Sequence, residues 1–315
     1  MKTLKYIFYL LTISFFVACE DVIELKTADV EPILSVDGTI TNQPGTQKIK
    51  LTYSQKLLSR AEYLPYLGAK VVVTDNNNRQ YEFVDKNNNG IYLWEPQNTT
   101  DTMGKVGNTY TLSIEKGTEK YTAKTELKRV TKVSYLKYSF KKDERPRPAD
   151  SKSPKEGYET RFYANDFKGF RDCYKVTIYK NDIPFAGPEN FILVFDAFLN
   201  KANLNKDDTV RTFILPIQRA APEYYLDGDK IKIEIRSITE PHFDFYTQIR
   251  TELNNAGLFA PPPARVPTNI VNVSAKNAQK DVSGWFGASA ISVFESTIEK
   301  SKAVEKLNDD EIIKL

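Results

Sequence analysis

The chain has 315 residues, of which 41% are hydrophobic and 27% are charged, proportions that exclude a largely disordered protein. Its 44 Lys and Arg residues nearly balance its 41 Asp and Glu residues, so the charge gives no support for nucleic-acid binding. An aromatic fraction of 12% favours β-structure over a helical bundle.

The start of the chain combines two basic residues, an apolar stretch and a cysteine. Lys2 and Lys5 precede the uncharged run 6–17, which is shorter than the roughly 20 residues that a permanent membrane helix needs. Residues 16–19 (FVAC) resemble a lipobox, in which a peptidase cleaves before a cysteine that carries diacylglycerol. We therefore expect a signal peptide at 1–18 and a lipid anchor on Cys19; the alternative is an ordinary secretory signal with an incidental cysteine.

Acidic residues follow the expected anchor directly. Glu20 and Asp21 resemble the signal that exports lipoproteins of the Bacteroidota to the cell surface. We expect residues 19–30 to be a lipidated tether and the chain to lie in the outer membrane, exposed at the cell surface. No second apolar run of about 18 residues follows, so we expect no transmembrane helix in the mature chain.

Residues 31–130 alternate short β-like segments with turn-forming residues. This spacing predicts a β-sandwich of immunoglobulin-like or prealbumin-like shape. Its strands are expected at 33–40, 47–53, 69–75, 80–84, 90–94, 109–115 and 121–128. The alternate apolar residues expected in its core are Ile49, Leu51, Val71, Val73, Leu112 and Ile114.

Residues 131–300 predict a second β-rich domain with one helix, and the charged, proline-rich stretch 141–154 near its start predicts a solvated linker or long loop. The helix is expected near 240–255, because Thr239 and Pro241 form a typical helix start and 254–257 (NNAG) a typical end. We expect a polar tail at 301–315. The expected strands are 132–140, 158–164, 174–179, 190–198, 210–215 and 230–238, followed by extended segments at 267–273 and 282–295.

Few residues suit catalysis or metal binding. The only histidine is His242, for which we expect a core or interfacial position on the helix, and Cys173 is expected to pack as a small apolar residue. One histidine and one cysteine besides Cys19 are too few for a common zinc site. This shortage of catalytic and metal-binding residue types favours a protein that is not an enzyme and needs no cofactor. The loop with Asp85, Asn87 and Asn89 begins like a calcium-binding loop, but a hairpin turn explains the same residues.

Two further groups of residues suggest surface functions. Thr102 and Thr209 each follow an aspartate and precede an apolar residue, which resembles the O-glycosylation signal of the Bacteroidota. Phe243, Tyr246 and Trp285 could form an aromatic ledge for a glycan or a peptide ligand. The alternative for these aromatic residues is the core, which we favour for Phe286.

Several segments together resemble a family of Bacteroidota outer-membrane lipoproteins known as domain of unknown function 4249. Trp285 departs from the family, which more often has Tyr or Phe there. The resemblance implies no catalytic residues, but members are commonly encoded beside TonB-dependent outer-membrane receptors. The resembling segments are 18–25 (ACEDVIEL), 31–38 (EPILSVDG), 40–42 (ITN), 254–257 (NNAG), the proline loop leading to Asn269-Ile270, and 284–290 (GWFGASA).

The sequence and the resemblance thus predict a surface-exposed, non-enzymatic lipoprotein that serves as a binding or accessory subunit of a TonB-dependent nutrient-uptake system. Its expected partners are the lipid bilayer, the receptor and a glycan or peptide ligand, and no nucleic acid. The alternative is a free-standing surface adhesin, or a glycan-binding or structural protein.

Overall fold

The strands and the helix among the described residues of the computed structural model belong to residues 33–54 and 62–315. The structure describes residues 31–55, 62–142, 154–165, 167, 172–185, 192–195, 212–216, 224–255, 261–262, 264–274 and 282–307.

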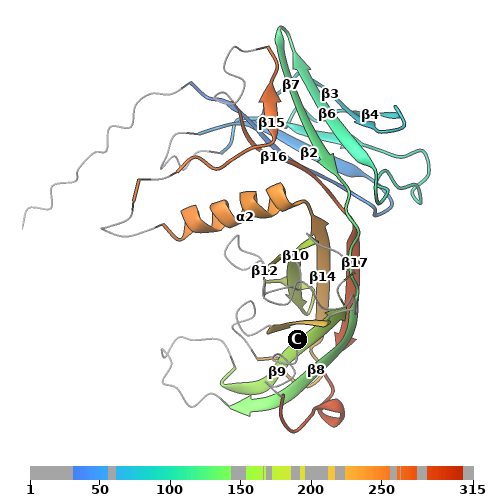
Figure 1. Ribbon diagram of the computed structural model, residues 1–315, viewed down its shortest axis with the longest axis vertical. Helices are drawn as coiled ribbons and strands as arrows, with labels where there is room; N and C mark the ends of the chain where they lie inside the picture. Colours follow the sequence, from blue (N-terminus) through green and yellow to red (C-terminus); the bar gives the residue numbers. More distant parts are fainter. Residues whose placement is uncertain are drawn as a thin grey trace, which may run out of the picture. The chain divides into compact units, whose positions relative to one another are not determined.

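Two sheets form a β-sandwich in the first region of the chain (Figure 1). One sheet has the strand order β16-β1-β2-β5 and the other has the order β15-β7-β6-β3-β4. The bounds in the first sheet are β16 Val282–Ser289, β1 Leu34–Thr41, β2 Gln47–Tyr53 and β5 Ile91–Trp94. Those in the second are β15 Ile270–Asn272, β7 Glu119–Glu126, β6 Thr109–Lys116, β3 Lys70–Asp75 and β4 Gln80–Phe83.

The sandwich core follows from period-two alternation in these strands. Because successive side chains of a strand point to opposite faces, β1 buries every second residue between the sheets. One continuous apolar cluster contains side chains from both sheets, which confirms the predicted sandwich. All six residues predicted for the core are fully buried: Ile49, Leu51, Val71, Val73, Leu112 and Ile114.

Two strands that we assigned to the second domain belong to the sandwich. β16 pairs in parallel with β1 over its whole length, and β15 pairs with β7. A Cβ on Gly284 would lie 2.0 Å from the Val36 backbone oxygen, and its φ is +89°, so only glycine fits where β16 meets β1. The expected assignment of 270–289 was therefore wrong, because chain order does not reveal which distant strand completes a sheet.

Two further sheets form the second β-rich region. β16 passes into β17 through Ala290 alone, so one extended stretch of chain serves both the sandwich and a sheet of this region. The first sheet has β11 Ile183–Pro184, β10 Cys173–Lys180, β14 Lys230–Ile238 and β17 Ile291–Thr297 in this order, with β12 Ile192–Phe195 also on β10. The second has β13 Thr212–Pro216, β9 Glu156–Asn165 and β8 Val133–Lys142, and a short 3-10 helix, η4, spans Lys300–Lys302.

The α-helix of the described residues, α2, spans Glu240–Leu253, as the sequence predicts. It starts after Thr239 with a proline in its first turn, and its buried residue is His242, at 3% exposure. Cys173 lies in β10 and is buried, at 1% exposure. Within the described residues, no helix has the length and apolar character to cross a bilayer.

Candidate functional site

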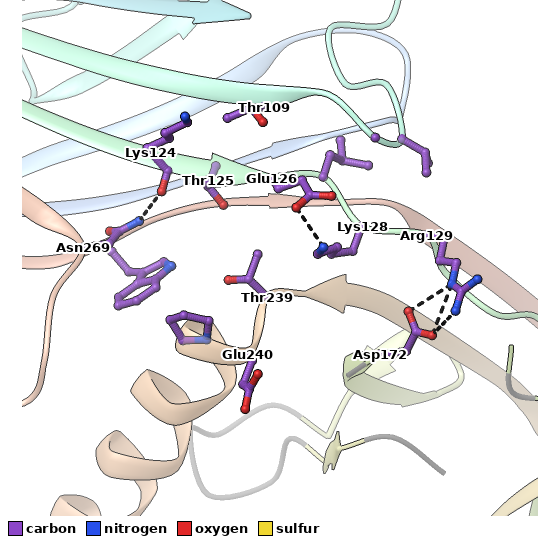
Figure 2. Close-up of a pocket in the computed structure, with 15 residues that line it drawn as sticks. Thr109, Lys124, Thr125, Glu126, Lys128, Arg129, Asp172, Thr239, Glu240 and Asn269 are labelled. Atoms are coloured by element: carbon purple, nitrogen blue, oxygen red, sulfur yellow. Dashed lines mark hydrogen bonds and ion pairs between the residues drawn. The ribbon is translucent and has the colours of Figure 1, made fainter. Parts of the chain in front are cut away.

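An open groove of about 930 Å³ follows the end of β7 and the chain after it. Figure 2 shows Lys124, Thr125 and Glu126 along one side of this groove and Thr239 and Glu240, at the start of α2, along the other. Strands and a helix therefore supply the walls, and these are the rigid elements on which a binding site can be positioned.

Asn269 connects two sheet edges beside the groove. Its Nδ2 donates a hydrogen bond of 2.7 Å to the Phe286 backbone oxygen and one of 3.4 Å to the Lys124 backbone oxygen. Its Oδ1 accepts a 3.0 Å hydrogen bond from the Phe286 backbone N–H. The Asn269 side chain thus connects the backbones of β16 and β7 beside the groove.

Trp285 places an unused hydrogen-bond donor in the lining. The residue is only 8% exposed, and its Nε1 is buried without a hydrogen-bond partner in the described part of the chain. A buried N–H that lacks a partner costs about 1–3 kcal/mol. Less than 1 Å² of this nitrogen is exposed, so the N–H is enclosed by neighbouring atoms although other atoms of Trp285 line the groove.

His242 lies in the middle of a ring cluster, which we define as His242, Phe245, Tyr246 and Trp285. The imidazole stacks on Tyr246 with a centroid distance of 4.5 Å and on Trp285 with a distance of 5.2 Å. Phe245 lies 5.0 Å from Trp285. Gly287 leaves room for this packing, since a Cβ there would lie 2.6 Å from His242 Cε1. The cluster attaches α2 to the outer face of the sandwich.

Burial controls the protonation of this cluster. Burial and the nearby Lys175 lower the pKa of His242 to about 3, so its imidazole is neutral at physiological pH. The Lys175 ammonium lies 4.3 Å from the centre of the Tyr246 ring, and burial, with Arg236 beside it, lowers the pKa of Lys175 to about 8. Because its pKa is so far below neutral pH, His242 is unsuited to general acid–base catalysis there.

The charged side chains of the groove are held mostly in ion pairs. Arg129 makes a forked interaction with the buried carboxylate of Asp172, with distances of 2.6–3.2 Å. Lys128 lies 2.8 Å from Glu126. The lining therefore carries fixed polar groups of both signs and no strong net charge.

The structure separates the three aromatic residues that we predicted as ligand contacts. Tyr246 and Trp285 meet at His242, whereas Phe243 packs against Phe195 at 5.5 Å. His242 and Phe245 pack against the rings of Trp285, which is only 8% exposed, so this residue does not present the open ring face that the predicted aromatic ledge needs. Phe286 is fully buried in the sandwich core, as predicted.

Sequence reasoning missed Lys124, Glu126 and Asn269. These residues line the groove because β7 and β16, which are far apart in the sequence, lie close to each other, and no local pattern signals this.

The loop with Asp85 is a hairpin turn between β4 and β5. The Asp85 carboxylate accepts hydrogen bonds from the backbone N–H groups of Asn87, Asn89 and Gly90 at 2.8–3.2 Å. The turn thus accounts for the residues that resemble a calcium loop. No cluster of three or more His, Cys, Asp and Glu residues suited to a metal ion occurs among the residues that the structure describes.

The remaining predicted sites cannot be placed in the groove. Thr102 is exposed between β5 and β6, where its glycosylation stays a prediction. Cys19, Glu20, Asp21 and Thr209 lie outside the described residues.

Comparisons with known proteins identify one family. A family model described as domain of unknown function DUF4249 matches residues 20–295. No curated protein matches the chain. A two-domain fibronectin type III segment of chicken tenascin is among the similar solved structures, with 14% identity and coverage of 65% of this chain and 90% of that chain. Its TM-score of 0.19 is too low to indicate a shared arrangement of strands.

Proposed function

The chain belongs to the DUF4249 family, and on this premise we propose that it is a lipid-anchored binding protein of the outer cell surface that serves as an accessory subunit of a TonB-dependent nutrient-uptake system. In this role the protein is not an enzyme, and its β-rich body holds a ligand or a receptor segment close to the membrane.

The N-terminal residues support the anchoring part of the proposal. The basic, apolar and small residues that precede Cys19 are those of a lipoprotein leader, and Glu20 and Asp21 resemble a surface-export signal. The family match begins at residue 20, directly after the cysteine, so the leader lies outside it. A lipidated cysteine holds a protein at a bilayer without a transmembrane helix.

One observation carries the binding part of the proposal, namely the open groove that Asn269, Trp285 and paired charged side chains line. Fixed polar groups of both signs in such a groove suit the recognition of a polar ligand. The neutral, buried His242 fits a structural part of a binding site better than a catalytic group.

Location and anchoring are tested in intact cells. We expect the wild-type protein to incorporate labelled palmitate and to be cleaved by protease added outside the cells. The Cys19→Ala variant should incorporate no label, and the Glu20→Ala/Asp21→Ala variant should stay acylated but become protected from protease. Acylation of Cys19→Ala, or full protection of the wild type, would contradict the proposal.

The receptor role is tested by purification from detergent-solubilised outer membranes. We expect a tagged copy to co-purify with a TonB-dependent β-barrel receptor in a stoichiometric amount, and deletion of the gene to reduce uptake of that receptor's substrate. Cys19→Ala serves as the matched control, because it keeps the folded body but lacks the lipid that should place it in the outer membrane. If the surface protein purifies without a receptor yet binds cell-wall or host-matrix glycans, the adhesin alternative replaces this proposal.

A further inference from the structure

Two hydrogen bonds fix the end of the sandwich at which the predicted tether joins it. The Ile33 N–H donates to Ser54 Oγ at 3.0 Å, and the Ser54 N–H donates to the Ile33 oxygen at 2.8 Å. Residues 20–32 connect this point to Cys19 and span at most roughly 50 Å even when fully extended. A lipid on Cys19 would therefore keep this end of the sandwich close to the bilayer.

The hairpin between β6 and β7 reaches the same end from the opposite sheet. Lys116 Nζ donates to Tyr53 Oη at 3.2 Å, and Tyr66 Oη donates to the Glu119 carboxylate at 2.6 Å. Tyr53 is the last residue of β2 and lies beside Ser54. We call this end of the sandwich the tether end and define it by Ile33, Tyr53, Ser54, Tyr63, Leu64, Lys116, Glu119, Lys120 and Val273.

Large apolar side chains are exposed at the tether end. Tyr63 is 63% exposed, Leu64 is 65% exposed and Val273 is 57% exposed. The Leu64 oxygen accepts from the Tyr53 N–H at 2.8 Å, and the Val273 N–H donates to the Lys120 oxygen at 2.9 Å, so one of these groups borders each sheet. They are three of the four most exposed large hydrophobic residues in the part of the chain that the structure describes. Apolar surface that gathers in one place marks a contact with a protein or a membrane.

Lysines lie beside tyrosines at this end. Lys116 Nζ lies 4.2 Å from the centre of the Tyr66 ring, and Lys50 Nζ lies 5.7 Å from the centre of the Tyr63 ring. Both residue types combine an apolar body with a polar tip, which suits the boundary between lipid chains and water.

The tether end carries charges of both signs. Glu115 pairs with Lys120 at 3.2 Å, and Glu119 accepts the hydrogen bond from Tyr66. Glu62 is exposed beside Tyr63. A contact at this end therefore depends on its apolar side chains more than on net charge.

From this geometry we propose that the tether end lies on the bilayer that holds Cys19, with the side chains of Tyr63 and Leu64 among the lipid headgroups. The short tether makes this contact intramolecular in effect, since it keeps the apolar side chains at a high local concentration near the lipid. Burial of their apolar surface in the interface then favours one orientation of the body. The inference rests on the proposed acylation of Cys19 and adds the surface that faces the lipid.

This orientation places the groove away from the lipid. β7 runs from Glu119, at the tether end, to Glu126, which lines the groove. A strand rises about 3.3 Å per residue, so the groove lies roughly 23 Å along β7 from the tether end. The groove therefore stays clear of the headgroups, where a molecule from outside the cell can reach it.

The first experiment places a tryptophan at each end of the sandwich. The acylated mature chain is reconstituted in vesicles of phosphatidylethanolamine and phosphatidylglycerol, with or without bromine on the acyl chains, because bromine quenches tryptophan on contact. Leu64→Trp reports on the tether end. Val106→Trp is the matched control, since Val106 is 48% exposed and precedes Gly107, which bonds to Leu127 beyond the other end of β7.

The emission of the wild type, which has two tryptophans, is subtracted from that of each variant. Apolar groups of an interfacial segment reach about 5–10 Å into the boundary between headgroups and acyl chains. We therefore expect brominated lipid to lower the added emission of Leu64→Trp about twofold and to leave that of Val106→Trp unchanged.

The second experiment removes the proposed contact. Val273→Trp supplies a reporter on the other sheet of the tether end, and Tyr63→Ser/Leu64→Ser is then added to it. We expect the double substitution to abolish most of the quenching of this reporter, because the apolar side chains that hold the end on the lipid are gone. Ile183→Ser is the control, since it removes an apolar side chain that is 72% exposed in β11, outside the sandwich, and it should leave the quenching unchanged.

Hydrogen exchange on the wild-type chain keeps the test valid if a variant does not fold. Attachment to vesicles should slow exchange of the Tyr63 and Leu64 amides at least about fivefold relative to the same chain without its lipid, and leave the Val106 amide unchanged. Equal quenching at the two ends, quenching at neither end, or unchanged exchange at Tyr63 and Leu64 overturns the orientation. Protection of the tether end only when a β-barrel receptor is present also overturns it, in favour of a protein contact.

Failure of this inference can be told apart from failure of the proposed function. Every vesicle sample carries a lipid on Cys19 that mass spectrometry confirms. Absence of labelled palmitate from Cys19 in cells contradicts the proposed function, whereas absence of quenching in the vesicles contradicts only the orientation.

Discussion

The sandwich core and the ring cluster on α2 are both buried, but they are built from different chemistry. The sandwich core consists of side chains without titratable groups at most positions, such as Ile49, Leu112 and Val71, which interdigitate between two sheets. The ring cluster contains an imidazole, and Lys175 contacts the Tyr246 ring. The core therefore stabilises the fold at any moderate pH, whereas the stability that the ring cluster contributes depends on proton binding.

This difference also separates stability from recognition. The sandwich satisfies its backbone hydrogen bonds between strands and leaves no donor to a ligand in its centre. The layer outside it contains the N–H of Trp285, which is buried and has no hydrogen-bond partner among the described residues. A protein can leave such groups unsatisfied only where another part of the molecule provides the stability.

The largest expected effect comes from breaking the sandwich at Gly284. Gly284→Ala places a methyl group 2.0 Å from the Val36 oxygen and should prevent β16 from pairing with β1, so that urea unfolding loses its cooperative transition. Gly68→Ala is the control, because its φ is also positive but no atom lies within 4 Å. That variant should lose only about 1 kcal/mol. Equal losses in the two variants would contradict the placement of β16.

Leu112→Ala tests the aliphatic side of the comparison. Leu112 is fully buried, and its truncation should lower the free energy of unfolding by about 3 kcal/mol through lost burial and a residual cavity. The loss should be the same at pH ~5 and pH ~8 in urea titrations, because no titratable group is removed. A loss that differs by more than about 1 kcal/mol between these pH values would argue against an uncharged core around this residue.

His242→Phe tests the ring side. The pKa of His242 is about 3 in the folded chain, below its ordinary value of 6.5, so the unfolded chain binds more protons between these values. Wild-type stability should therefore fall as the pH drops below about 6.5, and His242 should account for a loss of roughly 3 kcal/mol by pH ~4.5. His242→Phe keeps a stacked ring and should lack this contribution. Parallel stability–pH curves for the two proteins would disprove the assignment.

Removal of an exposed ion pair should give the smallest change in the free energy of unfolding, against which the larger losses can be compared. Lys86 and Glu95 pair at the Asp85 turn, where both side chains are at least half exposed. Solvent screens such pairs, so Lys86→Ala should change the free energy of unfolding by less than about 1 kcal/mol. Urea unfolding at low and high salt checks this value. A larger, salt-independent loss would mean that the turn contributes more than its ion pair.

Local patterns predicted much of the secondary structure. The alternation in Gln47–Tyr53 and Lys230–Ile238 placed β2 and β14 with their observed bounds, because a half-buried strand imposes a period of two on its own sequence. The start of α2 was predicted from Thr239 and Pro241, since both residues act within one turn of helix. The predicted division of the chain into two successive domains was wrong for β15 and β16, which belong to the sandwich.

The sequence by itself determined the strands, the helix, the alternate core residues and the expected anchor at Cys19, because each depends on near neighbours in the chain. Only the tertiary structure decided that β16 lies beside β1, that β15 pairs with β7, and that the Trp285 N–H is buried without a partner among the described residues. The Ile291 N–H, for example, donates to the Asn42 side chain 249 residues away. Such pairings are selected by packing across the whole fold, since many strands of similar composition could fill the same place and only one arrangement buries them all.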